Sequence, residues 1–130
     1  MKVIHVSGKR KSAIARVTLK PGKGIVRINS FPVHLYQPEM YRLKLLEPLL
    51  LAEGISKKVD IAVLVDGGGR SSQTDASRLG IGKALAKFHP TLKKVFLNYD
   101  RTLLVADIRR KETYKPNDSK ARKARQKSYR

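Results

Sequence analysis

The stretch KVDIAVLVDGGGRSSQTDASRLGIGKALAKFHP, residues 58–90, decides the fold class of this 130-residue chain. Its first nine residues are β-branched and apolar beyond Asp60, which is typical of a strand covered on both faces. Three glycines end that strand, and helical spacing predicts a helix that begins near residue 70 or 71 and stops before His89-Pro90. Gly80 and Gly82 each cost this helix about 1 kcal/mol against Ala, so we expect another backbone to pack closely there.

The segments on either side predict further strands and helices. Residues 3–7 indicate a short strand, and SAIARVTLK (12–20) alternates, with Ala13, Ala15, Val17 and Leu19 on one face. The PGKG turn then predicts a hairpin with a returning strand at 25–30. Apolar spacing after Pro38 predicts a helix that is kinked or broken at Pro48.

Downstream, TLKKVFLN predicts a short helix with Leu92, Val95 and Phe96 facing inward, and the second half of 102–110 indicates a last strand. The predicted fold is α+β. It has a mixed sheet of about four strands, helices mainly on one face, and a basic C-terminal tail. The sequence contains no internal repeat.

Charge is the strongest compositional fact, because 29 Lys and Arg against 10 Asp and Glu give +19. Residues 1–108 carry 19 basic and 8 acidic residues, or +11, and residues 109–130 carry 10 and 2, or +8. Such self-repulsion favours a polyanionic partner, and nucleic acid is the simplest one. An anionic membrane is the alternative, but there is no basic helix with a Trp- or Phe-rich apolar face and no spanning segment. Without cysteine or a signal peptide, a cytosolic location is expected.

The first candidate site is GKRKSAIAR, residues 8–16. Its spacing does not match a Walker phosphate loop. We expect the consecutive cations Lys9, Arg10 and Lys11 to fan out and clamp backbone phosphates. The alternative is a solvated basic turn.

The second candidate is GGGRSSQ, residues 67–73. One interpretation is a structural loop that ends the strand and starts the helix. The other is a phosphate site, in which glycines admit a polyanion backbone and the helix N-terminus supplies N–H groups, helped by Arg70, Ser71 and Gln73. Arg78 and Lys83 extend the basic stripe along the same helix.

Catalytic and metal-binding patterns are missing. The histidines, His5, His34 and His89, have no ligand-like spacing, and no nucleophile lies beside a base. We therefore expect no enzyme activity, no metal and no cofactor.

The third candidate is the tail, KPNDSKARKARQKSYR (115–130), in which seven residues are basic and one is acidic. It cannot bury enough apolar surface to order itself, and its interspersed small residues suit a chain that threads between RNA helices and folds there. A nonspecific basic arm is the alternative.

Four stretches together carry a family resemblance: GKRKSAIARV, PGKGIVRIN, GGGRSSQTDASRLGIGKAL and DIRRKETYKPNDSKARKARQKSYR. On them the whole chain resembles universal small-subunit ribosomal protein nine in its archaeal and eukaryotic form. The Tyr-Arg ending differs from the Lys-Arg ending of bacterial members.

The resemblance implies a two-layer sandwich with a left-handed βαβ crossover, an rRNA-binding domain at 1–111 and an extended tail at 112–130. It implies a structural protein of the cytoplasmic ribosome. The protein would lie on the 3′ domain of 16S-type rRNA in the head of the small subunit, beside other head proteins. The tail would reach the anticodon stem-loop of the peptidyl-site tRNA.

The expected rRNA-binding residues are mostly cations, namely Lys9, Arg10, Lys11, Arg16, Arg70, Ser71, Gln73, Arg78, Lys83, Arg109, Arg110, Lys111, Lys115, Lys120, Arg122, Lys123, Arg125 and Lys127. The expected tRNA contacts are Ser128, Tyr129 and Arg130. Two alternatives stay open: a free-standing protein that coats RNA or DNA, and a component of an RNA-processing enzyme related to the protein subunit of bacterial ribonuclease P.

Overall fold

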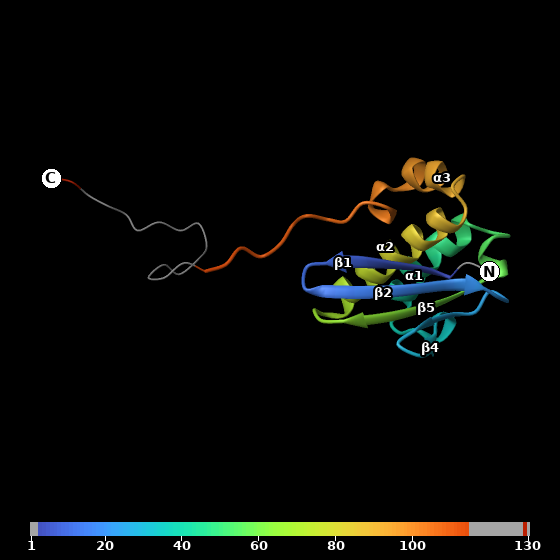
Figure 1. Ribbon diagram of the computed structural model, residues 1–130. Coiled ribbons are helices and arrows are strands. Elements are labelled where there is room, and N and C mark those ends of the chain that lie inside the picture. The colour runs from blue at the N-terminus through green and yellow to red at the C-terminus, as the bar shows by residue number, and fades with distance from the viewer. Residues whose placement is uncertain (1–2, 115–128, 130) are drawn as a thin grey trace.

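A computed structural model describes residues 3–114 and 129 of the chain. Its sheet has five strands in the order β1-β2-β5-β3-β4, and helices α1 and α2 lie behind it (Figure 1). In chain order the elements are β1 (Ile4–Arg10), β2 (Ala13–Pro21), β3 (Val26–Ile28), β4 (Phe31–Pro32), the 3-10 turn η1 (Val33–Leu35), α1 (Glu39–Leu51), η2 (Ser56–Lys58), β5 (Val59–Asp66), α2 (Arg70–Phe88), α3 (Leu92–Tyr99) and η3 (Arg101–Leu103). The α+β class is confirmed, with β4 as a fifth strand at the edge.

The strand order overturns the predicted hairpin. Strand β5 lies between β2 and β3, antiparallel to the first and parallel to the second, so β3, α1 and β5 form a crossover unit. The loop after β2 crosses the end of β5 because the Asp60 carboxylate accepts hydrogen bonds from the backbone N–H groups of Lys23 and Ile25, at 2.8 and 3.0 Å. These bonds hold the loop away from a tight turn, and the N–H of Gly22 donates to the Lys58 carbonyl as well.

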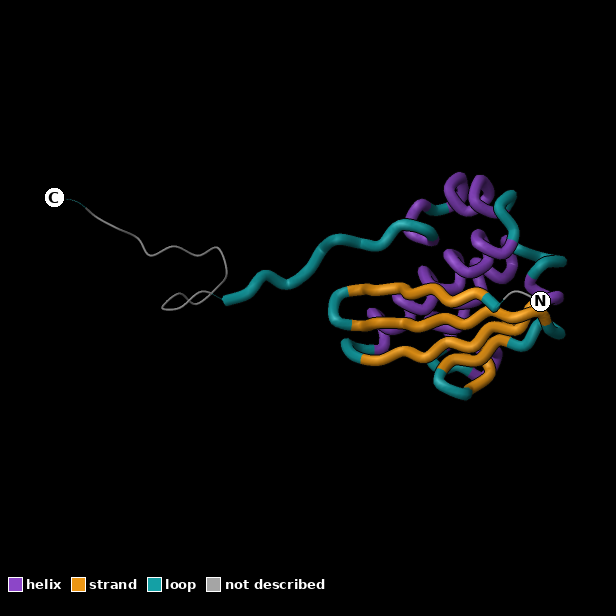
Figure 2. Tube along the Cα trace, viewed as in Figure 1, coloured by secondary structure: helices purple, strands orange, loops and turns teal. Residues whose placement is uncertain are grey.

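Only one face of the sheet is covered, which corrects the expectation that β5 is buried on both faces. Ile61, Val63 and Val65 point into the core, whereas Leu64 between them is 59% exposed. The predicted inward face of β2 is confirmed, since its four alternating residues from Ala13 to Leu19 are all buried. Figure 2 shows the strands in front and the helices on the far side.

Gly80 and Gly82 of α2 lie in close contact with neighbouring segments, as expected from the cost of glycine inside a helix. A Cβ on Gly82 would meet the backbone carbonyl of Leu103, and one on Gly80 would meet the side chain of Val17. Gly8 in β1 faces the same helix, because a Cβ there would overlap the Ala76 carbonyl and lie 2.9 Å from the Gly80 nitrogen. The helix therefore lies directly on β1 and β2.

Four local expectations need correction or extension. The helix α1 continues through Pro48, which is buried; of the expected kink or break, the break into two short helices therefore does not occur. Val95 in α3 is 43% exposed rather than inward. Residues 104–110 form no strand; the segment is instead held beside β1 by the ion pair between Asp107 and Arg10. Strand β1 continues to Arg10, so the first basic cluster begins within a strand.

Candidate nucleic-acid interface

Two of the three predicted basic segments meet where β1 turns into β2. A Cβ on Gly67 would lie 2.6 Å from the carbonyl oxygen of Ser12, and one on Gly68 would lie 3.2 Å from the Ala13 nitrogen. Both glycines have positive φ, +76° and +63°, which other residues rarely adopt. The β1–β2 turn therefore rests on the loop that precedes α2, and this contact explains two of the three glycines structurally.

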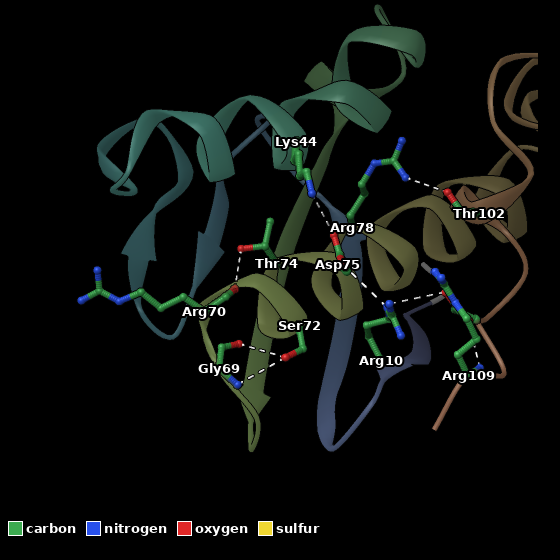
Figure 3. A network of polar contacts seen from close by, with 11 residues as sticks. Arg10, Lys44, Gly69, Arg70, Ser72, Thr74, Asp75, Arg78, Thr102 and Arg109 are labelled. Carbon is green, nitrogen blue, oxygen red and sulfur yellow. Dashed lines mark hydrogen bonds and ion pairs between the residues drawn. The ribbon is translucent and has the colours of Figure 1, made fainter. Parts of the chain in front are cut away.

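The third glycine, Gly69, precedes α2 and has open space around it. A Cβ on Gly69 would meet nothing within 4 Å, and the next two residues, Arg70 and Ser71, are exposed. Figure 3 shows the Arg70 side chain pointing away from the rest of the network. An exposed helix N-terminus with a glycine and an arginine is suited to a phosphate group.

Other polar side chains near this loop form hydrogen bonds within it. The Gln73 amide donates to the Gly67 carbonyl at 3.0 Å, so this predicted RNA donor closes the glycine loop. The Ser72 hydroxyl lies 3.3 Å from both the N–H and the carbonyl of Gly69 (Figure 3). Sequence reasoning missed Ser72, because the usual residues at this third helical position of a capping box are Glu and Gln.

The third basic segment, at the root of the tail, joins the same end of the domain. A groove of about 750 Å³ is lined by Arg10, Lys11, Ser12, Arg109, Arg110 and Lys111, so five of its six residues are cations. Arg110 and Lys111 are exposed, and the Lys111 ammonium lies 4.7 Å from the ring centre of Tyr114. Arg10 and Lys11 line this groove with residues 109–111, and the glycine loop before residues 70–71 packs against the same β1–β2 turn. We call the clusters at 9–11, 70–71 and 109–111 together the turn-end surface.

Arg10 holds this surface together. Its guanidinium pairs with Asp75 of α2 at 3.9 Å (Figure 3) and with Asp107 at the tail root at 3.5 Å. Its side chain is only 17% exposed, and its buried Nη1 has no hydrogen-bond partner within residues 3–114 and 129. Arg109 bonds the same Asp107 carboxylate, and its hydrogen bonds, with the charge of Arg10, hold the pKa of Asp107 far below its usual range. Arg10 therefore connects β1, α2 and the tail root, while its contact with rRNA stays a prediction.

Arg78 lies in a second internal network. Its Nε donates to Glu47 of α1 at 2.7 Å, and its two terminal nitrogens donate to Thr102 and Asp100, each at 3.0 Å. The side chain is 13% exposed. Burial acts to raise the pKa of Asp100, but the hydrogen bonds from Thr102 and Arg78 outweigh it and the pKa is lowered.

The remaining predicted residues of the domain lie on β1 and β2 or contact β1 from α2. Lys83 of α2 donates to the Ser7 carbonyl at 3.3 Å, which ties the helix to β1. Arg16 stands on the open sheet face, 71% exposed, and pairs with Asp66 at 3.7 Å. Lys9 is half-buried.

The expected contacts of the tail cannot be placed. Lys115, Lys120, Arg122, Lys123, Arg125, Lys127, Ser128 and Arg130 lie outside the described residues. Tyr129 is described and is 89% exposed. Within the described part of the chain, no three His, Asp or Glu side chains are placed to hold a metal ion. No helix in that part is long and apolar enough to cross a membrane.

Comparison with known proteins agrees with the resemblance. The family model described as ribosomal protein S9/S16 matches residues 8–130. The small ribosomal subunit protein uS9 of Methanococcus vannielii is 50% identical over the full length of both chains, and that of Methanococcus maripaludis strain C7 is 49% identical over the same extent. The chain therefore belongs to the ribosomal protein S9/S16 family.

Proposed function

We propose that this chain binds the rRNA of the small ribosomal subunit through the turn-end surface and that its tail continues this contact into the RNA. As a member of the S9/S16 family the chain is a structural component of the small subunit in the cytoplasmic ribosome and not an enzyme. The observation that carries the proposal is that two separate basic segments line one groove almost wholly with cations, while the glycine loop of the third segment packs against the same β1–β2 turn.

The proposed contacts divide by how each side chain is held. Lys11, Arg70, Arg110 and Lys111 are exposed and can each meet a phosphate. Ser71, Lys9 and Arg16 lie beside them or along the adjoining strands. Arg10, Gln73, Arg78 and Lys83 already bond carboxylates or backbone carbonyls of the domain, so they support RNA binding mainly by holding the surface in shape.

The finer parts of the proposal concern the place in the subunit. We place the domain on the 3′ domain of 16S-type rRNA in the head, with residues 112–130 as the tail. Lys115, Lys120, Arg122, Lys123, Arg125 and Lys127 bind rRNA, and Ser128, Tyr129 and Arg130 meet the peptidyl-site tRNA. A left-handed sense of the β3–α1–β5 crossover belongs to the same proposal. The terminal guanidinium suits this role because its planar fork can bridge two phosphate oxygens.

Salt dependence tests whether the tail contacts RNA. Residues 115–130 hold seven basic residues and one acidic residue, a net of +6. At about 0.7 per neutralised phosphate of single-stranded RNA, their removal should reduce the log–log salt slope of binding by about 4. Filter binding to the small-subunit rRNA from 50 to 500 mM salt measures it. An unchanged slope would mean that the tail lies off the RNA.

Removal of the last three residues tests the tRNA contact. Small subunits that contain the chain without residues 128–130 should assemble normally but release peptidyl-site tRNA faster. Toeprinting or filter binding of tRNA to purified subunits reads this out. Equal tRNA affinity in truncated and complete subunits would refute the role of the tip and leave the rRNA contacts untouched.

A further inference from the structure

One side of helix α1 is left uncovered by the described part of the chain. Leu45 and Pro48 are buried, whereas Met40, Leu43 and Leu50 are 59%, 55% and 69% exposed. Their spacing of three and seven residues places these three side chains on one face of the helix, which we call the α1 apolar face. A helix that only covers a core normally carries polar residues there.

The segment that leads into the helix adds to this exposure. Phe31 of β4 is 68% exposed and Leu35 of η1 is 62% exposed. Five large apolar side chains therefore meet solvent within residues 31–50. Apolar exposure gathered in this way marks an interaction site more often than a scatter of single residues does.

The charge of this region argues against RNA as its occupant. Residues 31–54 contain two cations and three acids, a net of −1 in a chain of +19. Both cations are already paired, since Arg42 bonds Glu39 at 3.1 Å and Lys44 pairs with Asp75 at 3.4 Å. Phosphate contacts need available Lys or Arg, so a polyanion gains little here.

Two occupants from the chain itself are also disfavoured. A second copy would bring another +19 charges against this one, and the two copies would repel each other. The tail, residues 115–130, has Tyr129 as its single large apolar residue, and that side chain is 89% exposed. Neither the tail nor a second copy supplies a matching apolar surface at low cost.

We propose that the α1 apolar face is the docking surface for a neighbouring protein of the small subunit that presents apolar side chains inside a basic rim. Glu39 and Glu53, whose side chains are 71% and 78% exposed, form ion pairs with Arg42 and Lys57 at the helix ends, so the net charge of −1 over residues 31–54, rather than free carboxylates, is what complements a basic rim. The inference rests on the proposed function, because such a neighbour is available only inside the subunit. It assigns opposite tasks to two parts of the domain, with RNA at the turn-end surface and protein at α1.

Met40 provides a probe that the chain already contains. Its oxidation by hydrogen peroxide, followed by peptide mass spectrometry, is compared in the free protein, in its complex with protein-free small-subunit rRNA, and in purified small subunits. The rate should be equal in the first two states and at least about tenfold slower in the subunits. Protection by rRNA alone, protection that grows with the concentration of free protein, or an unchanged rate in the subunits would each overturn the proposal.

A variant pair gives an independent measurement. The double variant Leu43→Gln/Leu50→Gln makes the α1 apolar face polar. The control variant Leu64→Gln changes a similarly exposed leucine on the open side of the sheet. We expect the double variant to be washed from subunits at lower salt than the unmodified chain, with unchanged binding to protein-free rRNA and an unchanged thermal midpoint. Equal retention of the double variant, or an equal loss in Leu64→Gln, would contradict the assignment.

The design separates the two levels of proposal. If the complete chain does not sediment with small subunits, the proposed function itself fails. If it does sediment with them while Met40 oxidises at the rate of the free protein, only the docking surface is wrong.

Discussion

Replacing Arg78 by Met should destabilise the domain without changing its salt-dependent RNA binding. The guanidinium makes three hydrogen bonds, two of them to the carboxylates of Glu47 and Asp100, and these bonds connect α1, α2 and η3. Met keeps much of the side-chain volume but leaves both carboxylates unpaired. The Arg78 variant therefore tests whether an arginine in the basic stripe of α2 stabilises the fold or binds RNA.

The expected loss follows from how buried the network is. Breaking a fully buried ion pair costs about 3–5 kcal/mol. Arg78 is 13% exposed but Glu47 and Asp100 are 31% and 36% exposed, so water can partly solvate the carboxylates once the arginine is gone. We expect a loss of about 2–3 kcal/mol, or a drop in thermal midpoint of about 10 °C for a domain of this size.

Arg70→Met is the matched control, because it removes the same charge from the exposed start of the same helix. We expect a change in unfolding free energy within about 0.5 kcal/mol and a fall in the log–log salt slope of about 0.7. Urea unfolding followed by circular dichroism and rRNA filter binding across a salt series give the two readouts. A stable Arg78→Met variant with a reduced salt slope would refute this reasoning and would return Arg78 to the RNA-binding set.

Two further predictions concern packing and pH. Gly8→Ala should lower the free energy of unfolding, measured with urea, by about 2–4 kcal/mol, because the new methyl group overlaps the backbone of α2. Gly69→Ala, where the space is open, should lower it by less than about 1 kcal/mol. Equal losses in the two variants would mean that the backbone around Gly8 shifts easily. The pKa values of Asp100 and Asp107 lie below their unfolded value of 3.8, so their contribution is complete at neutral pH and is lost as the pH falls from about 5 toward the folded values. Urea midpoints at pH 6, 5, 4 and 3 should therefore decline, and less steeply in Asp107→Asn; an identical pH profile in that variant would contradict the role of Asp107.

The features that the sequence predicted well are those set by local chemistry. Helix α2 begins at Arg70 and ends at Phe88, as the glycines before it and His89-Pro90 after it require. The inward face of β2 follows from simple alternation. The close backbone contacts at Gly80 and Gly82 follow from the cost of glycine inside a helix.

The features that the sequence predicted badly depend on distant partners. The PGKG turn suggested a hairpin, but the carboxylate of Asp60, 37 residues from Lys23, redirects that loop. The run of Val, Leu and Ala in β5 suggested burial on both faces, although Leu64 and Ala62 face solvent. Asp107 gave one unused signal, because an acid directly before the basic residues of DIRRK (107–111) suggests a structural ion pair.

The same limit applies to the candidate site. Consecutive cations at 9–11 predicted a clamp, yet strand geometry sends Arg10 inward to Asp75 and Asp107 while Lys11 stays exposed. Composition cannot distinguish an arginine that meets phosphate from one that meets a carboxylate of its own domain. Only the register of β1 against β2 and the position of α2 decide it.

The placement of the acids explains how so basic a chain keeps a defined surface before RNA arrives. Four of the ten acids, Glu47, Asp75, Asp100 and Asp107, line one groove together with Arg10, Lys44, Arg78 and Arg109. Pairing there neutralises the largely buried guanidinium groups of Arg10 and Arg78 and leaves the remaining positive charge on the outside, where a polyanion can reach it. The same groove fixes the tail root through Asp107, so residues 109–111 start from a defined position beside Lys11. For the proposed RNA-bound arm, a root that is already held reduces the entropy lost on binding, so the Arg10–Asp107 pair would support the proposed RNA contact without either side chain touching a phosphate.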